Sequence, residues 1–290
     1  MNQLKKLQAF QNVLATGTAI VDLLPTVGGN VLESIWLTLG GTALTKAMIT
    51  GIRLKANGKT IRETSGSTLD TRNKYFNVGT DATHLLMDFM YPHARTPQAF
   101  QTGAIDLSAN SGIKQLTLEV DIAGATAPTL IGSAEISPAG AVPGEERIRF
   151  VMLKQTKATV NVPAVGEFAI AIPHVRPEAG GSVFAAINLY SANTTNLRIR
   201  RQGIDEYDMP VALMQQIQQR AGRVPQAGHI AFDPCTDQIL AGRVWDTTSR
   251  SPTDPVRPGA GITSAEFLVT VSAPETFVVE TEELIYLNDY

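Results

Sequence analysis

Residues 52–58 read IRLKANG and residues 197–203 read LRIRRQG, two similar phrases 145 positions apart in a chain of 290 residues. At the same shift, His84 at the start of HLLMDF coincides with His229 at the start of HIAFDP, and Asp88 coincides with Asp233. In both halves 25 residues separate the phrase from the histidine. Two matches in one register indicate a duplicated module, and a repeat of this kind decides the fold.

The composition is that of a folded protein with ordinary domains. Hydrophobic residues make up 43% and charged residues 18% of the chain, as is usual for globular proteins. The formal net charge is −3 and the basic residues form no long block, which gives no support to an extended nucleic-acid-binding face. The repeat favours two domains over one large one.

Cys235 is the only cysteine, so the chain has no intrachain disulfide, as is common for proteins folded in a reducing cytoplasm. No apolar run approaches the roughly 18–20 residues needed to span a bilayer. The N-terminus lacks the continuous apolar region of a secretory signal. The sequence therefore predicts a soluble protein that is retained inside a cell.

From residue 18 onward, short apolar runs alternate with clusters of Gly, Pro, Asn and Ser. In residues 116–122 the apolar and polar side chains alternate strictly, which predicts a strand with one buried and one wet face. Asn57-Gly58 predicts a tight hairpin turn. The predicted strands cover residues 18–24, 34–39, 47–56, 84–90, 103–108, 114–123 and 130–136 in the first half and 147–160, 167–173, 182–191, 196–202, 229–233, 239–246, 266–273 and 277–287 in the second.

A helix is expected between the basic strand and the His-led strand in each half. Residues 65–77 predict a short one, with Ser67 as its N-cap. Residues 208–222 predict a clearer one, in which Asp208 caps the start and Gly222 closes the end. The order strand, Gly turn, helix and His-led strand is thus repeated.

Residues 1–16 form a segment of their own. Leu4, Leu7, Phe10 and Leu14 recur at three- and four-residue spacing, which predicts an amphipathic helix with Lys5 and Lys6 mainly on its other faces. An isolated helix of this length is marginal in water. We expect this N-terminal arm to dock on its own domain, on a neighbouring subunit or on a membrane surface.

The domain plan follows from the strand pattern and the repeat. After the arm, residues 17–146 form a first β-sandwich that ends in a Pro- and Gly-rich linker, residues 137–146, and residues 147–290 form a second. About seven short strands in each module favour an all-β fold of two tandem jelly rolls with short helices. Residues 247–264 form a long proline-rich loop, and such a loop is usually functional or mobile.

The paired His and Asp residues are the strongest candidates for chemistry. Four positions along a strand place His84 and Asp88 on one face about 13 Å apart, and the same holds for His229 and Asp233. Members of a pair cannot share a metal ion or a proton directly, so we interpret them as polar positions on a wet face. Cys235 lies in no nucleophile signature and is interpreted as a buried, inert thiol.

Other candidate sites also have structural interpretations. The phrase containing Glu280, Glu282, Glu283 and Asp289 lacks the spacing of a calcium loop and predicts a solvated edge strand protected by its charges. The basic residues Arg53, Lys55, Arg198 and Arg200 lie on wet strand faces without stacking aromatics, which leaves nucleic-acid binding a minor alternative. The glycine pairs are not followed by the Gly-Lys-Ser/Thr of a phosphate-binding loop. The sequence predicts no enzyme and offers no catalytic, cofactor-binding or metal-binding residue.

Two stretches carry a resemblance to a known family. They are IRLKANGKTIRETSGSTLDTRNKYFN (52–77) and LRIRRQGIDEYDMPVALMQQIQQR (197–220). With the N-terminal arm and the tandem sandwiches, the chain resembles the double jelly-roll major capsid proteins of tailless, membrane-containing icosahedral phages, above all the corticovirus type. The likeness covers most of residues 15–290 as a pattern.

The resemblance implies a structural virion protein. Three subunits would form a trimer of pseudo-hexagonal symmetry that tiles an icosahedral shell over an internal membrane. The implied partners are other copies of the chain, neighbouring capsomers and minor capsid or vertex proteins, with assembly in the host cytoplasm. The arm residues Leu4, Lys5, Lys6, Leu7 and Phe10 would then touch the membrane or a neighbouring capsomer.

Two other functions remain open at this point. A β-sandwich of this kind also serves as a carbohydrate-binding or carbohydrate-active module, but the two tryptophans, Trp36 and Trp245, lie inside predicted strands and no pair of catalytic carboxylates stands out. The fold pattern alone does not exclude a receptor-binding spike or another virion accessory protein.

Overall fold

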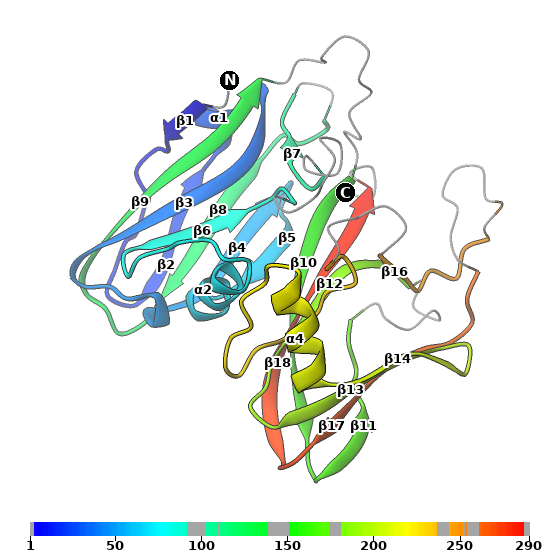
Figure 1. Cartoon of the computed structure of the whole chain (residues 1–290). Helices are drawn as coiled ribbons and strands as arrows, with labels where there is room; N and C mark the ends of the chain where they lie inside the picture. The colour runs from blue at the N-terminus through cyan, green and yellow to red at the C-terminus, as the bar shows by residue number, and fades with distance from the viewer. Residues whose placement is uncertain are drawn as a thin grey trace. The chain divides into compact units, whose positions relative to one another are not determined.

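The computed structural model describes residues 3–91, 102–108, 111–138, 151–173, 181–236, 244–251, 253 and 261–286. The chain divides into two compact units (Figure 1). Unit 1 consists of residues 1–74 and 78–155 together with the chain from Ile285 onward, and unit 2 consists of Tyr75–Asn77 and Thr156–Leu284. In each unit, antiparallel sheets enclose an apolar core.

In unit 1, one sheet has the strand order β1-β9-β3-β6, with β7 paired to β3, and the other has the order β2-β8-β4-β5. The strands are β1 (Gln3–Lys6), β2 (Gly17–Asp22), β3 (Asn30–Ala43), β4 (Ile49–Ala56), β5 (Lys59–Thr64), β6 (His84–Asp88), β7 (Ile105–Asp106), β8 (Leu116–Ile122) and β9 (Thr126–Pro138). Ile35, Leu54 and Leu118 are fully buried between the sheets.

In unit 2, one sheet has the order β10-β18-β12-β15, with β16 paired to β12, and the other has the order β11-β17-β13-β14. The strands are β10 (Val151–Val162), β11 (Gly166–Ala169), β12 (Val183–Tyr190), β13 (Thr194–Arg201), β14 (Ile204–Pro210), β15 (Ile230–Phe232), β16 (Trp245–Asp246), β17 (Ala265–Val271) and β18 (Glu275–Tyr286). Ile187, Leu197 and Val269 are buried in its core.

The alternation predicted for residues 116–122 is confirmed in β8, where every second side chain is buried. Each buried aliphatic side chain contributes about 1.5–3 kcal/mol relative to an exposed one. The outward face carries the charges: Arg53 of β4 binds the Asp121 carboxylate through Nη2 at 2.9 Å and that of Glu119 through Nε at 3.1 Å. Arg53 and Lys55 thus belong to ion pairs on a half-exposed face, as expected.

The hairpin turns fall where they are expected. Asn57 and Gly58 have φ of 49° and 81°, and Gln202 and Gly203 have φ of 52° and 76°. Two consecutive positive φ angles characterise the two-residue turn whose twist matches that of antiparallel strands. The Asn57-Gly58 prediction is confirmed, and its counterpart uses Gln202 in the same conformation.

Both predicted helices exist, but their N-caps differ from the prediction. α2 spans Gly66–Tyr75, and Ser65, not Ser67, accepts a bond from the Thr68 N–H through its hydroxyl group at 3.4 Å. α4 spans Val211–Arg220 with no side-chain cap, because β14 continues to Pro210 and Asp208 instead accepts a bond from Asn196. Gly222, with a φ of 84°, follows the end of α4 as predicted. Two short turns complete the set, α1 (Leu24–Val27) and the 3-10 helix η1 (Lys46–Met48).

The predicted N-terminal helix is wrong. Residues Gln3–Lys6 form β1, which pairs antiparallel with β9 from Gln3↔Ile136 to Lys6↔Ser133. Leu7 and Phe10 then enter the core of unit 1. Gly132 makes this possible, because a Cβ there would lie 2.6 Å from Leu7 Cδ1. Pairing along a sheet edge gives the segment backbone hydrogen bonds that an isolated short helix could not hold in competition with water.

The prediction of a solvated acidic edge strand near the C-terminus is also wrong. β18 lies between β10 and β12, and Glu280, Glu282 and Glu283 are at most 2% exposed. Two of these carboxylates receive hydrogen bonds: the Tyr190 hydroxyl donates to Glu280 at 3.1 Å and the Ser182 hydroxyl to Glu283 at 2.7 Å. Hydrogen bonding of this kind is the condition under which charged groups are tolerated in an interior.

Some predictions fall outside the described residues. These are most of the linker 137–146 with the boundary at residue 146, part of the 247–264 loop, and Asp289. The described part of that loop is anchored, since Thr247 is buried and exchanges hydrogen bonds with Ser182 and Ile262 is 4% exposed. Within the described chain, no helix is long and apolar enough to cross a membrane.

Candidate assembly surfaces and the repeated polar site

The 145-residue repeat is present in the structure down to single hydrogen bonds. The β4–β5 hairpin pairs Leu54 with Arg62 and has a bulge after Leu54; the β13–β14 hairpin pairs Ile199 with Tyr207 and has a bulge after Ile199. Each of these positions differs by 145. A bulge adds an unpaired residue and local twist, so its retention indicates that the two hairpins share one backbone design.

The helix that follows each hairpin is fastened to the His-led strand by the same bond. Asn73 Nδ2 of α2 donates to the Leu86 carbonyl at 2.9 Å. Gln218 Nε2 of α4 donates to the Ala231 carbonyl at 2.6 Å. Both pairs of residues are again 145 apart, and both bonds are buried. A buried amide that satisfies a strand carbonyl fixes the helix on the sheet.

In unit 1 three polar side chains stand side by side across three strands. Ser34 of β3 lies opposite both Asp88 of β6 and Glu135 of β9, and its hydroxyl donates to Glu135 at 2.7 Å. Burial raises the pKa of Asp88 to about 6. The Met90 N–H and the charges of Arg72 and Arg62 oppose this rise, and the Glu135 charge adds to it.

In unit 2 the equivalent site holds a buried ion pair. Arg223 Nε lies 3.1 Å from Asp233 Oδ2, and both side chains are 1% exposed. Burial raises the pKa of Asp233, the nearby guanidinium of Arg223 opposes this rise, and Glu282 of β18 adds to it. Continuing the β12–β15 register by one residue places Asp233 opposite Ala186, whose other neighbour is Glu282. The aspartate–glutamate arrangement of unit 1 is therefore repeated.

The two histidines have different surroundings. His84 is half-exposed and its Nδ1 lies 2.8 Å from Asp81, in agreement with the predicted wet face. His229 is buried, with Nε2 3.0 Å from Asn188 Oδ1 and its ring 5.2 Å from that of Tyr190. The prediction of wet faces is wrong for His229 and Asp233, because a second polar layer covers this side of the unit 2 sheet, whereas Asp88 in unit 1 is partly exposed.

The second polar layer in unit 2 includes residues from the end of α2. The Tyr75 hydroxyl lies 3.5 Å from Asp233, and Arg223 lies over the Phe76 ring at 5.0 Å from its centroid. Burial raises the pKa of Tyr75 well above its ordinary range. These groups neutralise and solvate one another, and the cluster contains no exposed nucleophile with a base beside it. Its chemistry is that of a structural polar core.

The lone cysteine is placed as expected. Cys235 is buried, and its N–H donates to Asp233 at 3.0 Å. Among the described residues, no group of three or more His, Cys, Asp or Glu side chains is arranged to hold a metal ion.

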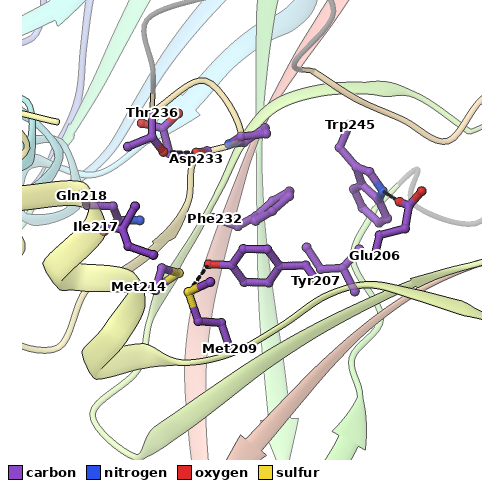
Figure 2. Close-up of a pocket in the computed structure, with 12 residues that line it drawn as sticks. Glu206, Tyr207, Met209, Met214, Ile217, Gln218, Phe232, Asp233, Thr236 and Trp245 are labelled. Carbon is purple, nitrogen blue, oxygen red and sulfur yellow. Dashed lines mark hydrogen bonds between the residues drawn. The ribbon is translucent and has the colours of Figure 1, made fainter. Parts of the chain in front are cut away.

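A cavity of about 410 Å³ lies in unit 2 beside α4, where the helix packs on the β13–β14 hairpin. Figure 2 shows Phe232 and Tyr207 between Trp245 and the α4 residues Met214 and Ile217. The Tyr207 hydroxyl contacts Met209 Sδ at 3.4 Å, and Trp245 Nε1 donates to Glu206 at 3.2 Å. The cavity is lined by Ile199, Glu206, Tyr207, Met209, Met214, Ile217, Gln218, Phe232, Asp233, Pro234, Thr236 and Trp245.

The five predicted arm residues divide into two groups. Leu7 and Phe10 are buried in unit 1, whereas Leu4 is 67% exposed, and Lys5 and Lys6 lie at the surface of β1. Only the second group is accessible to another molecule. Both tryptophans lie in strands as predicted; Trp36 donates to Glu135 and Trp245 is buried, so neither offers an exposed platform for a sugar.

Sequence reasoning did not identify the partners of the aspartates. Arg223 and Glu282 act on Asp233, and Arg62, Arg72 and Glu135 act on Asp88. A signal was present in part: Arg72 lies on a predicted helix, and Glu135 and Glu282 lie in predicted strands. Pairing these positions required the sheet register.

Two antiparallel β-sandwiches in tandem, built on one repeated plan, define the double jelly-roll class of viral capsid proteins. The chain superposes on the major capsid protein P2 of bacteriophage PM2 with a TM-score of 0.80 at 16% identity, over 99% of this chain and 98% of that one. It superposes on a chain of Sulfolobus turreted icosahedral virus with a TM-score of 0.71 at 14% identity (98% and 90% covered), and on a chain of the PBCV-1 virus capsid with 0.61 at 11% (98% and 93%).

The family models agree with the fold. The viral coat protein P2 N-terminal domain matches residues 4–137, and the viral coat protein P2 C-terminal domain matches residues 152–285. The chain therefore belongs to the viral coat protein P2 family. It is a structural protein of a virion and not a member of an enzyme family. No curated protein sequence matches it.

Proposed function

We propose that this chain is a major capsid protein that forms trimers of pseudo-hexagonal symmetry. One observation carries the proposal. The hairpin register, the bulge in the hairpin and the hydrogen bond that attaches the helix to the His-led strand all recur in the second unit at the same shift of 145 residues. Three copies of a chain with two like modules present six similar outer edges under three-fold symmetry. Six similar edges suit a block that meets six neighbours in a shell.

The same proposal extends to the assembled particle. The trimers tile an icosahedral shell over an internal membrane, with minor capsid or vertex proteins as further partners, and assemble in the host cytoplasm. Membrane contact through the N-terminal segment depends on Leu4, Lys5 and Lys6, because Leu7 and Phe10 are buried in unit 1. An apolar side chain beside two lysines is a combination that binds either an anionic membrane or an acidic protein surface.

The first experiment is size-exclusion chromatography of the purified chain with light scattering. The expected mass is three times the 31.1 kDa of one chain. A stable monomer across a concentration series would contradict the proposal.

A second experiment separates membrane contact from self-association. Flotation with vesicles that contain anionic lipids is compared for the native chain and a Lys5→Glu, Lys6→Glu variant. Vesicle binding that requires the two lysines supports the proposed membrane contact. Equal flotation of both proteins contradicts it.

A further inference from the structure

The helices α2 and α4 end in the same backbone motif. Each is followed by a residue of positive φ, Asn77 at 58° and Gly222 at 84°. In each helix the N–H of the residue after that donates to the carbonyl five positions earlier, as in a Schellman motif. The two bonds are Val78 N–H to Asn73 at 2.8 Å and Arg223 N–H to Gln218 at 2.9 Å. The segments Tyr75–Asn77 and Arg220–Gly222 therefore hold equivalent places at the ends of their helices.

The segment at the end of α2 is buried in unit 2. Tyr75–Asn77 belongs to that unit, and Tyr75 is 1% exposed. The Tyr75 carbonyl accepts a hydrogen bond from the Val224 N–H at 2.8 Å, and the Tyr75 ring lies 5.2 Å from that of His229. Its hydroxyl group lies 3.5 Å from Asp233. His229 and Asp233 are buried beneath this segment.

The equivalent segment and the equivalent surface are both open to solvent. Arg220 and Gly222 are exposed at the end of α4. At the shift of 145, the covered residues Val224, His229 and Asp233 correspond to Gly79, His84 and Asp88. Gly79 is exposed, and the other two are partly exposed. The chain thus exposes both a second version of the covering segment and a second version of the surface that such a segment covers.

The side chains exchanged between the two sites conserve a cation. In unit 2 the cation beside Asp233 is Arg223, and Tyr75 brings a hydroxyl group. In unit 1 the place of Arg223 is taken by Val78. In the segment at the end of α4, the place of Tyr75 is taken by Arg220. A docked Arg220 supplies the cation that Val78 does not.

The unit 1 surface suits a cation. Asp88 is partly exposed there, and Asp81, which is bonded to His84, has a side chain that is 63% exposed. Arg62 and Arg72 act on Asp88 by their charges, but both are buried. Acidic groups therefore predominate on the exposed part of this surface, and an arginine docked on it meets charges of the opposite sign.

We propose that the segment at the end of α4 docks on unit 1 of a second copy, with Arg220 against Asp88 and His84. The inference rests on the proposed trimer and names the residues at which its chains meet. The contact repeats the one that Tyr75–Asn77 makes within unit 2. In a closed ring of three chains, every module then carries the same covering contact. The docked guanidinium opposes the raised pKa that Asp88 has in the single chain.

Disulfide trapping tests the contact directly. The hydrogen bond from Val224 to Tyr75 in unit 2 supplies the positions, because its equivalents at the proposed interface are Gly79 and Arg220. Within the described chain, a Cβ added to Gly79 has open space around it. In a Cys235→Ala background, a chain with both Gly79→Cys and Arg220→Cys is oxidised mildly. We expect covalent dimers and trimers on a non-reducing gel, and neither from the two single variants.

The matched control replaces Arg220→Cys by Gln219→Cys. Gln219 is exposed at the same helix end, and its equivalent Lys74 is 53% exposed and paired with Asp70. We expect no covalent product from this control. A trimeric chain that forms no link between positions 79 and 220, or that links position 219 equally well, overturns the inference. A chain that light scattering shows to be monomeric overturns the proposed trimer as well.

Charge reversal tests the contact without a cross-link. Arg220→Glu places a carboxylate against Asp88, and we expect self-association to weaken by about tenfold or more. Arg220→Lys keeps the positive charge and should weaken it less. Gln219→Glu should change self-association by less than about twofold. Equal association of the Arg220→Glu and Gln219→Glu proteins, with circular dichroism showing both folded, contradicts the inference.

Discussion

Asp88 in unit 1 and Asp233 in unit 2 occupy equivalent places, each one strand away from a glutamate of the same sheet. The electrostatic environments of the two aspartates nevertheless differ. Asp233 has a buried guanidinium at 3.1 Å. Asp88 accepts a hydrogen bond from the Met90 N–H at 3.0 Å and senses Arg62 and Arg72 through their charges. After duplication, main-chain features such as turns and bulges were kept in both units, while the side chains that balance charge diverged.

The largest predicted effect concerns the ion pair. Arg223→Met leaves the Asp233 carboxylate buried without its partner, and we expect the free energy of unfolding of unit 2 to fall by about 3–5 kcal/mol. Arg53→Met, which breaks half-exposed pairs in unit 1, should cost about 1 kcal/mol or less. Urea titration followed by tryptophan fluorescence distinguishes the units, because Trp36 lies in unit 1 and Trp245 in unit 2. Equal losses of unfolding free energy in the two variants would contradict the expected difference between a buried ion pair and half-exposed ones.

The second prediction concerns pH and unit 1. The pKa of Asp88 is raised to about 6 from 3.8, so its folded form favours the neutral carboxyl. The raised pKa of Asp88 stabilises the folded state of unit 1 fully below pH 3.8, and this stabilisation is lost as the pH rises through about 6. Asp88→Asn should therefore stabilise unit 1 above pH 7 by at most about 3 kcal/mol. The native protein and the Asp88→Asn variant should differ little at about pH 4.

Thermal melts of the two proteins from about pH 4 to about pH 8 check this prediction. A constant difference at all pH values would show that Asp88 does not titrate differently in the folded chain.

The third prediction concerns the bond that both units kept. Asn73→Leu and Gln218→Leu each remove a buried donor from a strand carbonyl and should cost about 1–3 kcal/mol in their own unit. Hydrogen exchange of the β6 and β15 amides should rise with each loss. If one substitution is neutral and the other costly, the bond is structural in only one unit.

The smallest predicted effect concerns the turns. Asn tolerates positive φ better than Gln, so Gln202→Asn should stabilise unit 2 and Asn57→Gln should destabilise unit 1, each by roughly 0.5 kcal/mol. Chemical denaturation of the single variants measures both. Shifts of the same sign would mean that factors other than backbone conformation dominate.

Much of the fold could be predicted because its determinants are local. The repeat, the strict alternation of residues 116–122, the Asn57-Gly58 turn and Gly222 after α4 each act within a few residues. β5 and β14 were not predicted as separate strands, since both are polar partners in hairpins. Asp208 matched a helix-cap pattern, but pairing with β13 carries β14 through Pro210.

The errors have one physical origin. Leu4, Leu7 and Phe10 have helical spacing, yet the free edge of β9 and the space above Gly132 favour an extended segment. The glutamates of β18 imply an exposed strand until its two neighbours are known. In each case a tertiary partner distant in sequence overrides a local pattern. The polar site and the cavity depend on sheet register, which the sequence alone did not supply.

The most direct test of the account is low-resolution electron microscopy of the purified chain. Two like sandwiches per chain and three chains per capsomer predict particles with three-fold symmetry and a hexagonal outline. Class averages that show single chains, or rings with another symmetry, would contradict the claim that the duplication builds a capsid block.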